Sequence, residues 1–82
     1  MTIAHYASDH AQQRAVERLG FAPTTEQWRD AALAILDTIA GQPRALMTRR
    51  HEETETWVVA IAGRPARVIW SPRFAVVVTV LR

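Results

Sequence analysis

Hydrophobic residues recur at helical spacing in the first half of the chain, most clearly between residues 25 and 40. Thr24 is a typical N-cap there, and Gln27, three residues later, completes a capping box. Gly41 and Pro43 are residues that end a helix. The apolar positions follow the i, i+3, i+4 pattern of a helix that buries one face, and they are Trp28, Ala31, Ala32, Ile35, Leu36 and Ile39. The pattern predicts a core helix over residues 25–40.

A narrower apolar face precedes this helix. Ala11, Ala15 and Leu19 lie four residues apart and would share one side of a helix. Asp9 is the expected N-cap, with Ser8 as the alternative one residue earlier. Gly20 follows directly and is typical of a helix C-terminus. These signals together predict a first helix over residues 9–19.

The hydrophobic period changes from helical to alternating after Pro43. In residues 55–62, Trp57, Val59 and Ile61 alternate with smaller or more polar residues, as in a half-buried strand. Three more strands are expected, near residues 45–50, 67–70 and 74–81, where FAVVVTVL is apolar on both faces like an interior strand. The turns AGRP and SPR between them are too short for crossover helices, so neighbouring strands must be antiparallel.

The predicted fold class is therefore α+β, with two N-terminal helices packed on a four-stranded antiparallel sheet in the order α-α-β-β-β-β. An 82-residue chain closes one modest core, so residues 1–82 are expected to form a single domain, with the sheet at about residues 45–81. Both helices need a surface on which to bury their apolar faces, and one face of the sheet supplies it.

Composition removes several classes of function. The chain has no cysteine, which excludes disulfides and thiolate metal sites. Its longest apolar runs are too short to span a bilayer, and the N-terminus lacks the pattern of a signal peptide. We expect a soluble protein of the bacterial cytoplasm with no membrane partner, no metal site and no cofactor.

Positive charge is concentrated in the half of the chain that is expected to form the sheet. All ten basic residues are arginines. Residues 1–43 carry three arginines and five acidic residues, a net charge of −2, whereas residues 44–82 carry seven arginines and three glutamates, a net charge of +4. Because arginine presents a planar, permanently charged fork, this half is suited to contacts with phosphate or carboxylate groups.

Three groups of residues are candidates for binding. His10, Arg14 and Arg18 lie four apart along one stripe of the first helix, where Glu17 would partly neutralise them. This stripe is interpreted either as a solvated helix face or as a contact surface for phosphate or for an acidic partner. Arg49 and Arg50 begin the polar run RRHEETE, which is expected at a hairpin tip as a solvated turn or as an adaptable contact patch.

The third group lies in the later strands and turns. Arg64, Arg67 and Arg73 are interleaved with Trp70 and Phe74. Arginines that hold phosphates beside aromatic rings that stack on bases are typical of proteins that bind single-stranded RNA. The aromatic side chains are equally what a small core requires, and the sequence leaves both interpretations open.

Short motifs at both ends of the chain resemble small phage and prophage proteins. The motifs are Ser8-x-His10-Ala11-x-x-Arg14 with Arg18 and Gly20, then Arg67-Val68-Ile69-Trp70-x-Pro72 and Val78-Thr79-Val80-Leu81. Those proteins are similar in layout to RelE-type and BrnT-type toxins, and the resemblance implies an antiparallel sheet that binds RNA. The chain departs from these toxins because it has no lysine and its only tyrosine, Tyr6, precedes the first helix. The departure implies a catalytic set that is thinned or lost.

The expected function is therefore that of a non-enzymatic phage or mobile-element protein that inhibits a host nucleic-acid-handling complex. In size and simplicity the chain resembles anti-CRISPR proteins, so a CRISPR surveillance complex is the expected target. The partner would be a host protein or ribonucleoprotein, with nucleic-acid contact as a further option, and the protein itself a monomer or a small homo-oligomer. The alternative is a metal-independent, RelE-like toxin that cleaves mRNA with His10 or His51 beside Arg64, Arg67 or Arg73. A third option is a small structural or regulatory module.

Overall fold

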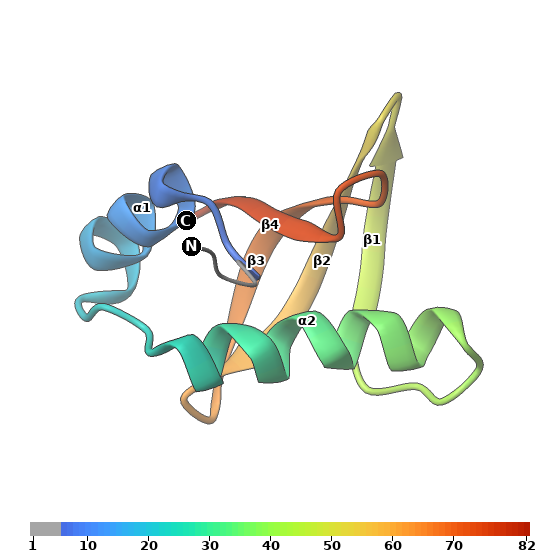
Figure 1. Ribbon diagram of the computed structural model, residues 1–82, viewed down its shortest axis with the longest axis horizontal. Coiled ribbons are helices and arrows are strands. Elements are labelled where there is room, and N and C mark those ends of the chain that lie inside the picture. Colours follow the sequence, from blue (N-terminus) through green and yellow to red (C-terminus); the bar gives the residue numbers. More distant parts are fainter. Residues whose placement is uncertain (1–5) are drawn as a thin grey trace.

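Two helices precede a four-stranded antiparallel sheet, which confirms the predicted fold class (Figure 1). The computed structural model describes residues 6–82. Each strand pairs with its neighbour in the sequence, so the strands follow one another across the sheet in chain order. The elements are α1 (Asp9–Leu19), α2 (Thr25–Ile39), β1 (Leu46–His51), β2 (Thr54–Ile61), β3 (Arg64–Ser71) and β4 (Val76–Val80).

The helix ends follow the local sequence signals, with one correction. At α2 the predicted capping box is present, because the Gln27 N–H donates to Thr24 Oγ1 over 3.1 Å and the Thr24 N–H donates to Gln27 Oε1 over 2.9 Å. At α1 the N-cap is Ser8 and not Asp9. Its Oγ accepts the Ala11 N–H over 3.0 Å and donates to the main-chain oxygen of Val78 over 2.8 Å. Ser8 therefore both caps the helix and forms a hydrogen bond to the sheet.

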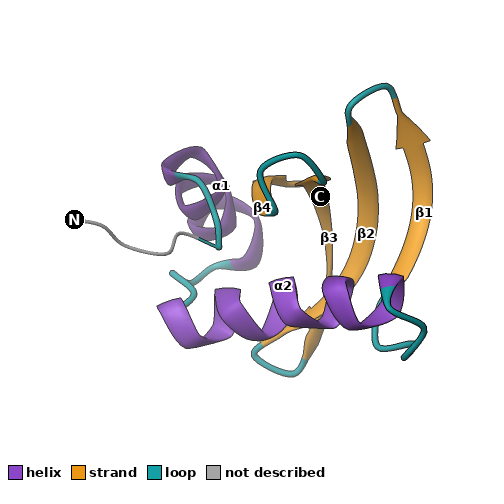
Figure 2. Ribbon diagram, turned by 45° about the vertical axis from the view of Figure 1, so that its right-hand side comes forward, coloured by secondary structure: helices purple, strands orange, loops and turns teal. Residues whose placement is uncertain are grey.

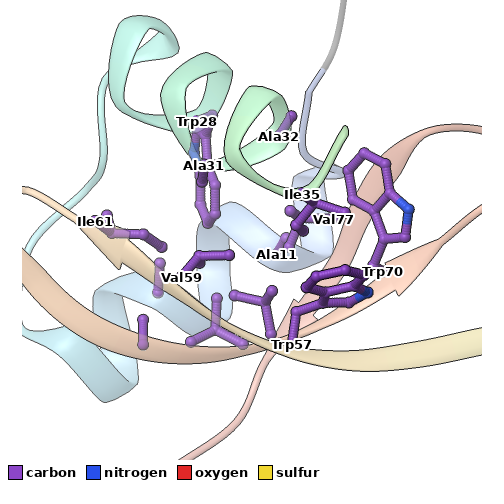
Figure 3. Packing of buried hydrophobic residues seen from close by; sticks show 14 residues of the cluster. Ala11, Trp28, Ala31, Ala32, Ile35, Trp57, Val59, Ile61, Trp70 and Val77 are labelled. Atoms are coloured by element: carbon purple, nitrogen blue, oxygen red, sulfur yellow. The ribbon is translucent and has the colours of Figure 1, made fainter. Parts of the chain in front are cut away.

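Both helices cover the same face of the sheet, and the core lies between the two layers (Figures 2 and 3). Trp57 and Val59 of β2 point toward α2, which confirms their predicted inward face. Trp28 and Ile35 of α2 meet them there and are 5% and 0% exposed. The expectation that Ile39 is also a core residue is wrong, since its side chain is 59% exposed. The middle turns of α2 pack on the sheet, whereas its last turn is left uncovered.

The two edges of the sheet differ. The edge at β4 is closed by the segment before α1, where Ala7 forms a parallel bridge with Val77 and the Ser8 N–H donates to the Val77 oxygen over 2.9 Å. Arg18 adds a bond from its Nη1 to the Val80 oxygen over 2.9 Å. The strand expected to be interior is therefore the last strand of the sheet, with its outer edge sealed by the chain's own N-terminal part. Every residue of β1, at the opposite edge, is exposed.

The turns between strands account for smaller differences from the expected boundaries. Arg64 was expected in a turn but begins β3, because the hairpin closes on Ala62 and Gly63. These two residues have φ angles of +54° and +77°, as in a type I′ turn. Phe74 was expected in the last strand but lies in the turn before β4.

Candidate functional site

The sheet face that points away from both helices is uncovered, and we call it the open face (Figure 2). Side chains alternate between the two faces of a strand, and residues paired across an antiparallel ladder share a face. Because Trp57 and Val68 are paired and buried under the helices, their neighbours Thr56 and Ile69 lie on the open face. The open-face residues are Leu46, Arg49, His51, Thr54, Thr56, Val58, Ala60, Pro65, Arg67, Ile69, Thr79 and Leu81.

The open face is basic and carries no acidic side chain. Its ionisable residues are Arg49, His51 and Arg67, and all three are exposed. A depression of about 470 Å³ brings the three together with threonine hydroxyls and two aliphatic side chains. The residues that line it are Thr48, Arg49, His51, Thr54, Thr56, Arg67, Ile69 and Leu81. A depression with this lining is suited to an anionic ligand, because it offers hydrogen-bond donors and no carboxylate to repel the ligand.

Of the eight arginines outside the open face, four are paired with acids of residues 6–82 and four are not. Four arginines form ion pairs within the described residues, and the pairs are Arg14–Glu17, Arg44–Asp37, Arg50–Glu55 and Arg73–Glu53. On the open face, Arg67 Nη1 donates only to the main-chain oxygen of Arg82, over 3.1 Å. Arg49 forms neither an ion pair nor a side-chain hydrogen bond with any residue from 6 to 82. The charge of this face is therefore left available to a partner.

The three residues of the expected stripe on α1 differ in their contacts. His10 is exposed, whereas Arg14 Nη1 lies 2.6 Å from Glu17 Oε1, which matches the neutralisation expected for a solvated helix face. Arg18 uses its guanidinium to bind the Val80 oxygen at the sealed edge. The stripe therefore presents less free charge than its spacing indicates.

The five candidate arginines of the second half do not form one surface. Arg49 and Arg50 are neighbours in β1 and so lie on opposite faces, with Arg50 Nη2 2.9 Å from Glu55 Oε2 on the helix side. Arg73 lies in the turn before β4, with its guanidinium carbon 5.2 Å from the centre of the Phe74 ring. Arg64 lies at the start of β3. Arg49 and Arg67 line the depression on the open face, whereas Arg50 and Arg73 line a separate one whose lining includes three glutamates.

The aromatic rings are not placed for stacking on bases at the open face. Trp57 and Trp70 are 3% and 1% exposed on the helix side, and Trp57 Nε1 donates to Glu55 Oε1 over 3.0 Å. Phe74 is 70% exposed, but it lies in a turn under Arg73. The tryptophans therefore belong to the core, as one of the two interpretations predicts.

The depression offers limited means for catalysis. Histidine is the residue type most used for general acid–base catalysis, and His51 is the one histidine in the lining. His10 lies on α1, outside that lining. Within residues 6–82, no three histidine, aspartate or glutamate side chains gather closely enough to hold a metal ion. In the same part of the chain, neither helix has the length and apolar composition needed to cross a membrane.

The expected binding residues omit several that the structure places in the depression, namely His51 and the threonines of β1 and β2. Alternation along residues 49–51 is the signal that would have found His51, because it separates Arg50 from the face that holds Arg49 and His51. Comparisons with models of protein families, with curated proteins and with solved structures gave no match. The geometry of the open face is therefore the basis for a functional proposal.

Proposed function

We propose that this protein is a non-enzymatic binding domain that inhibits a host nucleic-acid-handling complex by holding an anionic surface of that complex on its open face. One observation carries the proposal. The open face brings Arg49 and Arg67 together in one depression that has no carboxylate, whereas four other arginines are each paired with a carboxylate. Exposed ion pairs add only about 0–1 kcal/mol to folding, so unpaired surface arginines do not serve stability. In a desolvated interface, truncating one arginine costs about 2 kcal/mol or more.

The proposed partner is a protein or ribonucleoprotein surface and not a run of unstacked bases. Sequence-tolerant binding of single strands uses aromatic rings on which bases stack, and the open face has aliphatic side chains in their place. Val58, Ile69 and Leu81 are half-buried and would add apolar contact around the two arginines. The phage or mobile-element origin and the CRISPR surveillance complex as the target are narrower proposals, which rest on the sequence resemblance and on size.

Quantitative capture from a bacterial lysate tests this proposal. The bait is the tagged protein, compared with the double variant Arg49→Ala/Arg67→Ala and with the control Arg14→Ala/Arg73→Ala, which removes the same charge from paired positions. We expect the open-face variant to lose the captured complex and the control to retain it. Equal capture by both variants would contradict the proposal.

Salt dependence of the captured interaction identifies what the arginines contact. Direct phosphate binding weakens steeply and linearly on a log–log plot, because counterions are released. A protein surface gives a shallower loss, mainly in the association rate. We expect the shallow dependence, since the net charge of the chain is only +2.

A second candidate function, cleavage of RNA, is favoured by one specific observation. His51 lies in the same depression as Arg49 and Arg67, so a histidine adjoins two groups that stabilise phosphate charge. Incubation of the purified protein with free and ribosome-bound mRNA tests this function. Specific cleavage that a His51→Ala variant abolishes would establish the toxin in place of the binding domain, and intact RNA is the result that we expect.

A further inference from the structure

Among the described residues, the sheet has one free edge, the outer side of β1. Residues 6–8 and Arg18 already occupy the outer side of β4, whereas no segment among residues 6–82 pairs with the outer side of β1. Unpaired main-chain groups on an exposed edge are a template for another strand. Because only one edge is free, pairing between copies through it stops at two and forms a closed dimer.

Exposed apolar side chains gather next to this edge. Six large hydrophobic residues are exposed in the described part of the chain, and four of them lie on β1 or on the last turns of α2. They are Leu36, Ile39, Leu46 and Met47, which are 41%, 59%, 62% and 39% exposed. Leu46 lies on the open face and Met47 on the helix side, so exposed apolar side chains flank the free edge on both faces of the sheet. Exposed apolar side chains beside a free strand edge are typical of a surface that contacts another protein.

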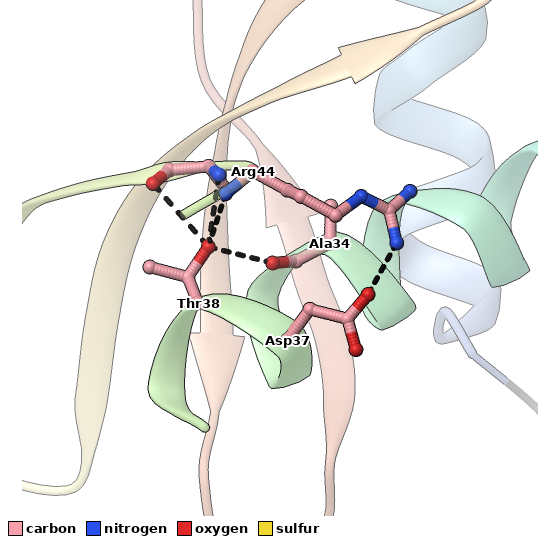
Figure 4. Close-up of polar contacts among 5 residues, drawn as sticks. Ala34, Asp37, Thr38 and Arg44 are labelled. Carbon is pink, nitrogen blue, oxygen red and sulfur yellow. Dashed lines mark hydrogen bonds and ion pairs between the residues drawn. The ribbon is translucent and has the colours of Figure 1, made fainter. Parts of the chain in front are cut away.

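The end of α2 and the start of β1 are held together, so this surface has a fixed shape (Figure 4). Thr38 Oγ1 accepts the N–H groups of Arg44 and Ala45, each over 2.9 Å, and it donates to the Ala34 oxygen over 2.8 Å. Arg44 Nη1 also donates to Asp37 Oδ2. Partner binding would therefore cost little reordering of this part of the chain.

We propose that a second copy of this chain occupies the edge, with β1 pairing antiparallel to β1 across a two-fold axis. The two sheets then become one continuous sheet, with both open faces on the same side. This proposal is independent of the function proposed above, because it uses the sheet edge and not the open face.

A β-bulge between Met47 and Arg49 places Leu46 and His51, five residues apart, on the same face of β1. With this bulge, the strand is self-complementary in the register that pairs its whole length. Leu46 of one copy then lies opposite His51 of the other, and Met47 lies opposite Arg50. Both pairs match faces, since Leu46 and His51 are on the open face and Met47 and Arg50 are on the helix side. A second register, in which Arg50 of one copy lies opposite Arg50 of the other, also matches faces. It is unfavourable because like charges directly opposite repel each other.

Charge complementarity at both ends favours the same register. Beyond the strand ends, this register places Glu53 of one copy beside Arg44 of the other. Within residues 6–82 of its own chain, Glu53 has only a 3.9 Å contact with Arg73, and Arg44 is paired with Asp37. It also brings Arg50 of one copy toward the C-terminus of the partner's α2, a helix whose last turn has no basic residue. A cation there interacts favourably with the helix dipole. Because the two-fold axis repeats each contact, the same charged contacts form at both ends of the paired β1 strands.

The mass in solution is the first test. Analytical ultracentrifugation of the full chain should show concentration-dependent association from 9.2 kDa to twice that mass, with no larger species. A mass that stays at 9.2 kDa up to about 1 mM protein, or association beyond two copies, would overturn the proposal.

Charge substitution at Met47 then tests the register. Met47→Arg sets arginine against Arg50 twice in the dimer and should raise Kd by about threefold to thirtyfold, whereas Met47→Glu should lower it. Circular dichroism checks that both variants fold. Equal weakening by the two variants, or no effect of either, would contradict this register.

Engineered disulfides test the same register without any substitution at Met47, so the result does not depend on whether the Met47 variants are stable. The chain has no cysteine, so Leu46→Cys/His51→Cys introduces the only thiols. Directly opposite residues of an antiparallel pair lie within disulfide range, so mild oxidation should give a covalent dimer. Leu46→Cys alone should form no covalent dimer, because the two copies of residue 46 lie at opposite ends of the interface. Failure of the double variant to crosslink would count against the dimer.

Discussion

Replacing Ile35 with alanine should destabilise the protein far more than the same replacement at Ile39, one helical turn later. Ile35 is 0% exposed and packs in the cluster with Trp28, Trp57 and Val59, so its truncation removes buried methyl groups and leaves a cavity. Truncations of this kind cost about 2–5 kcal/mol. Ile39 is already 59% exposed, and complete burial of such a side chain contributes only about 1.5–3 kcal/mol, so its loss should cost less than about 1 kcal/mol. Both substitutions change helix propensity equally, so that effect cancels in the comparison.

Urea unfolding followed by tryptophan fluorescence measures the difference, at low micromolar protein so that self-association does not contribute. A chain of 82 residues has a total stability of about 4–12 kcal/mol, so the Ile35 variant loses a large share of it. With a slope of about 1–3 kcal/mol per molar urea, its midpoint should fall by about 1–3 M. An Ile39→Ala variant that is as destabilised as Ile35→Ala would refute the assignment of the middle turns of α2 to the core.

Three further substitutions test other parts of the structure. Ala62→Asn should raise the free energy of unfolding by about 0.5–1 kcal/mol, because asparagine before Gly63 is preferred at the positive φ angles of a type I′ turn; a lower midpoint in urea would contradict this turn. Thr38→Val should destabilise by about 1–3 kcal/mol, since the Ala45 N–H loses its acceptor, and an unchanged thermal melt would argue against that contact. Arg49→Ala/Arg67→Ala should change stability by less than about 0.5 kcal/mol in the same melt, and a larger loss would assign these arginines to folding.

The parts of the fold that the sequence predicted correctly depend on local signals. Thr24 and Gln27 are three residues apart, and the alternation of Trp57, Val59 and Ile61 marks a half-buried strand without reference to any distant residue. The packing of both helices on one face of the sheet was also predicted, but the hydrogen bonds between distant segments were not. Ser8 replaces Asp9 as the cap of α1 because Ser8 also bonds to Val78, 70 residues away, a partner that no local pattern indicates.

The candidate site was predictable only in part, for a similar reason. Arg49 and Arg67 were identified from charge, but their separation from Arg50 depends on strand register, and their lack of a carboxylate depends on where Glu55 lies. Arg18 matched a surface pattern, yet it binds the main chain of a strand 62 residues away. Charge and spacing identify candidate residues, whereas the pairing of charges in three dimensions separates those that are free to bind.

The central claim, that the open face is the anion-binding surface, is tested most directly by mapping a bound anion on the protein. Two-dimensional ¹H–¹⁵N NMR spectra recorded during titration with poly-L-glutamate report the position of the contact residue by residue. We predict that the largest shifts fall on Arg49, Thr56, Arg67 and Ile69, and that they disappear in the Arg49→Ala/Arg67→Ala variant. Shifts centred on α1 around Arg14, or none at saturating probe, would contradict the account.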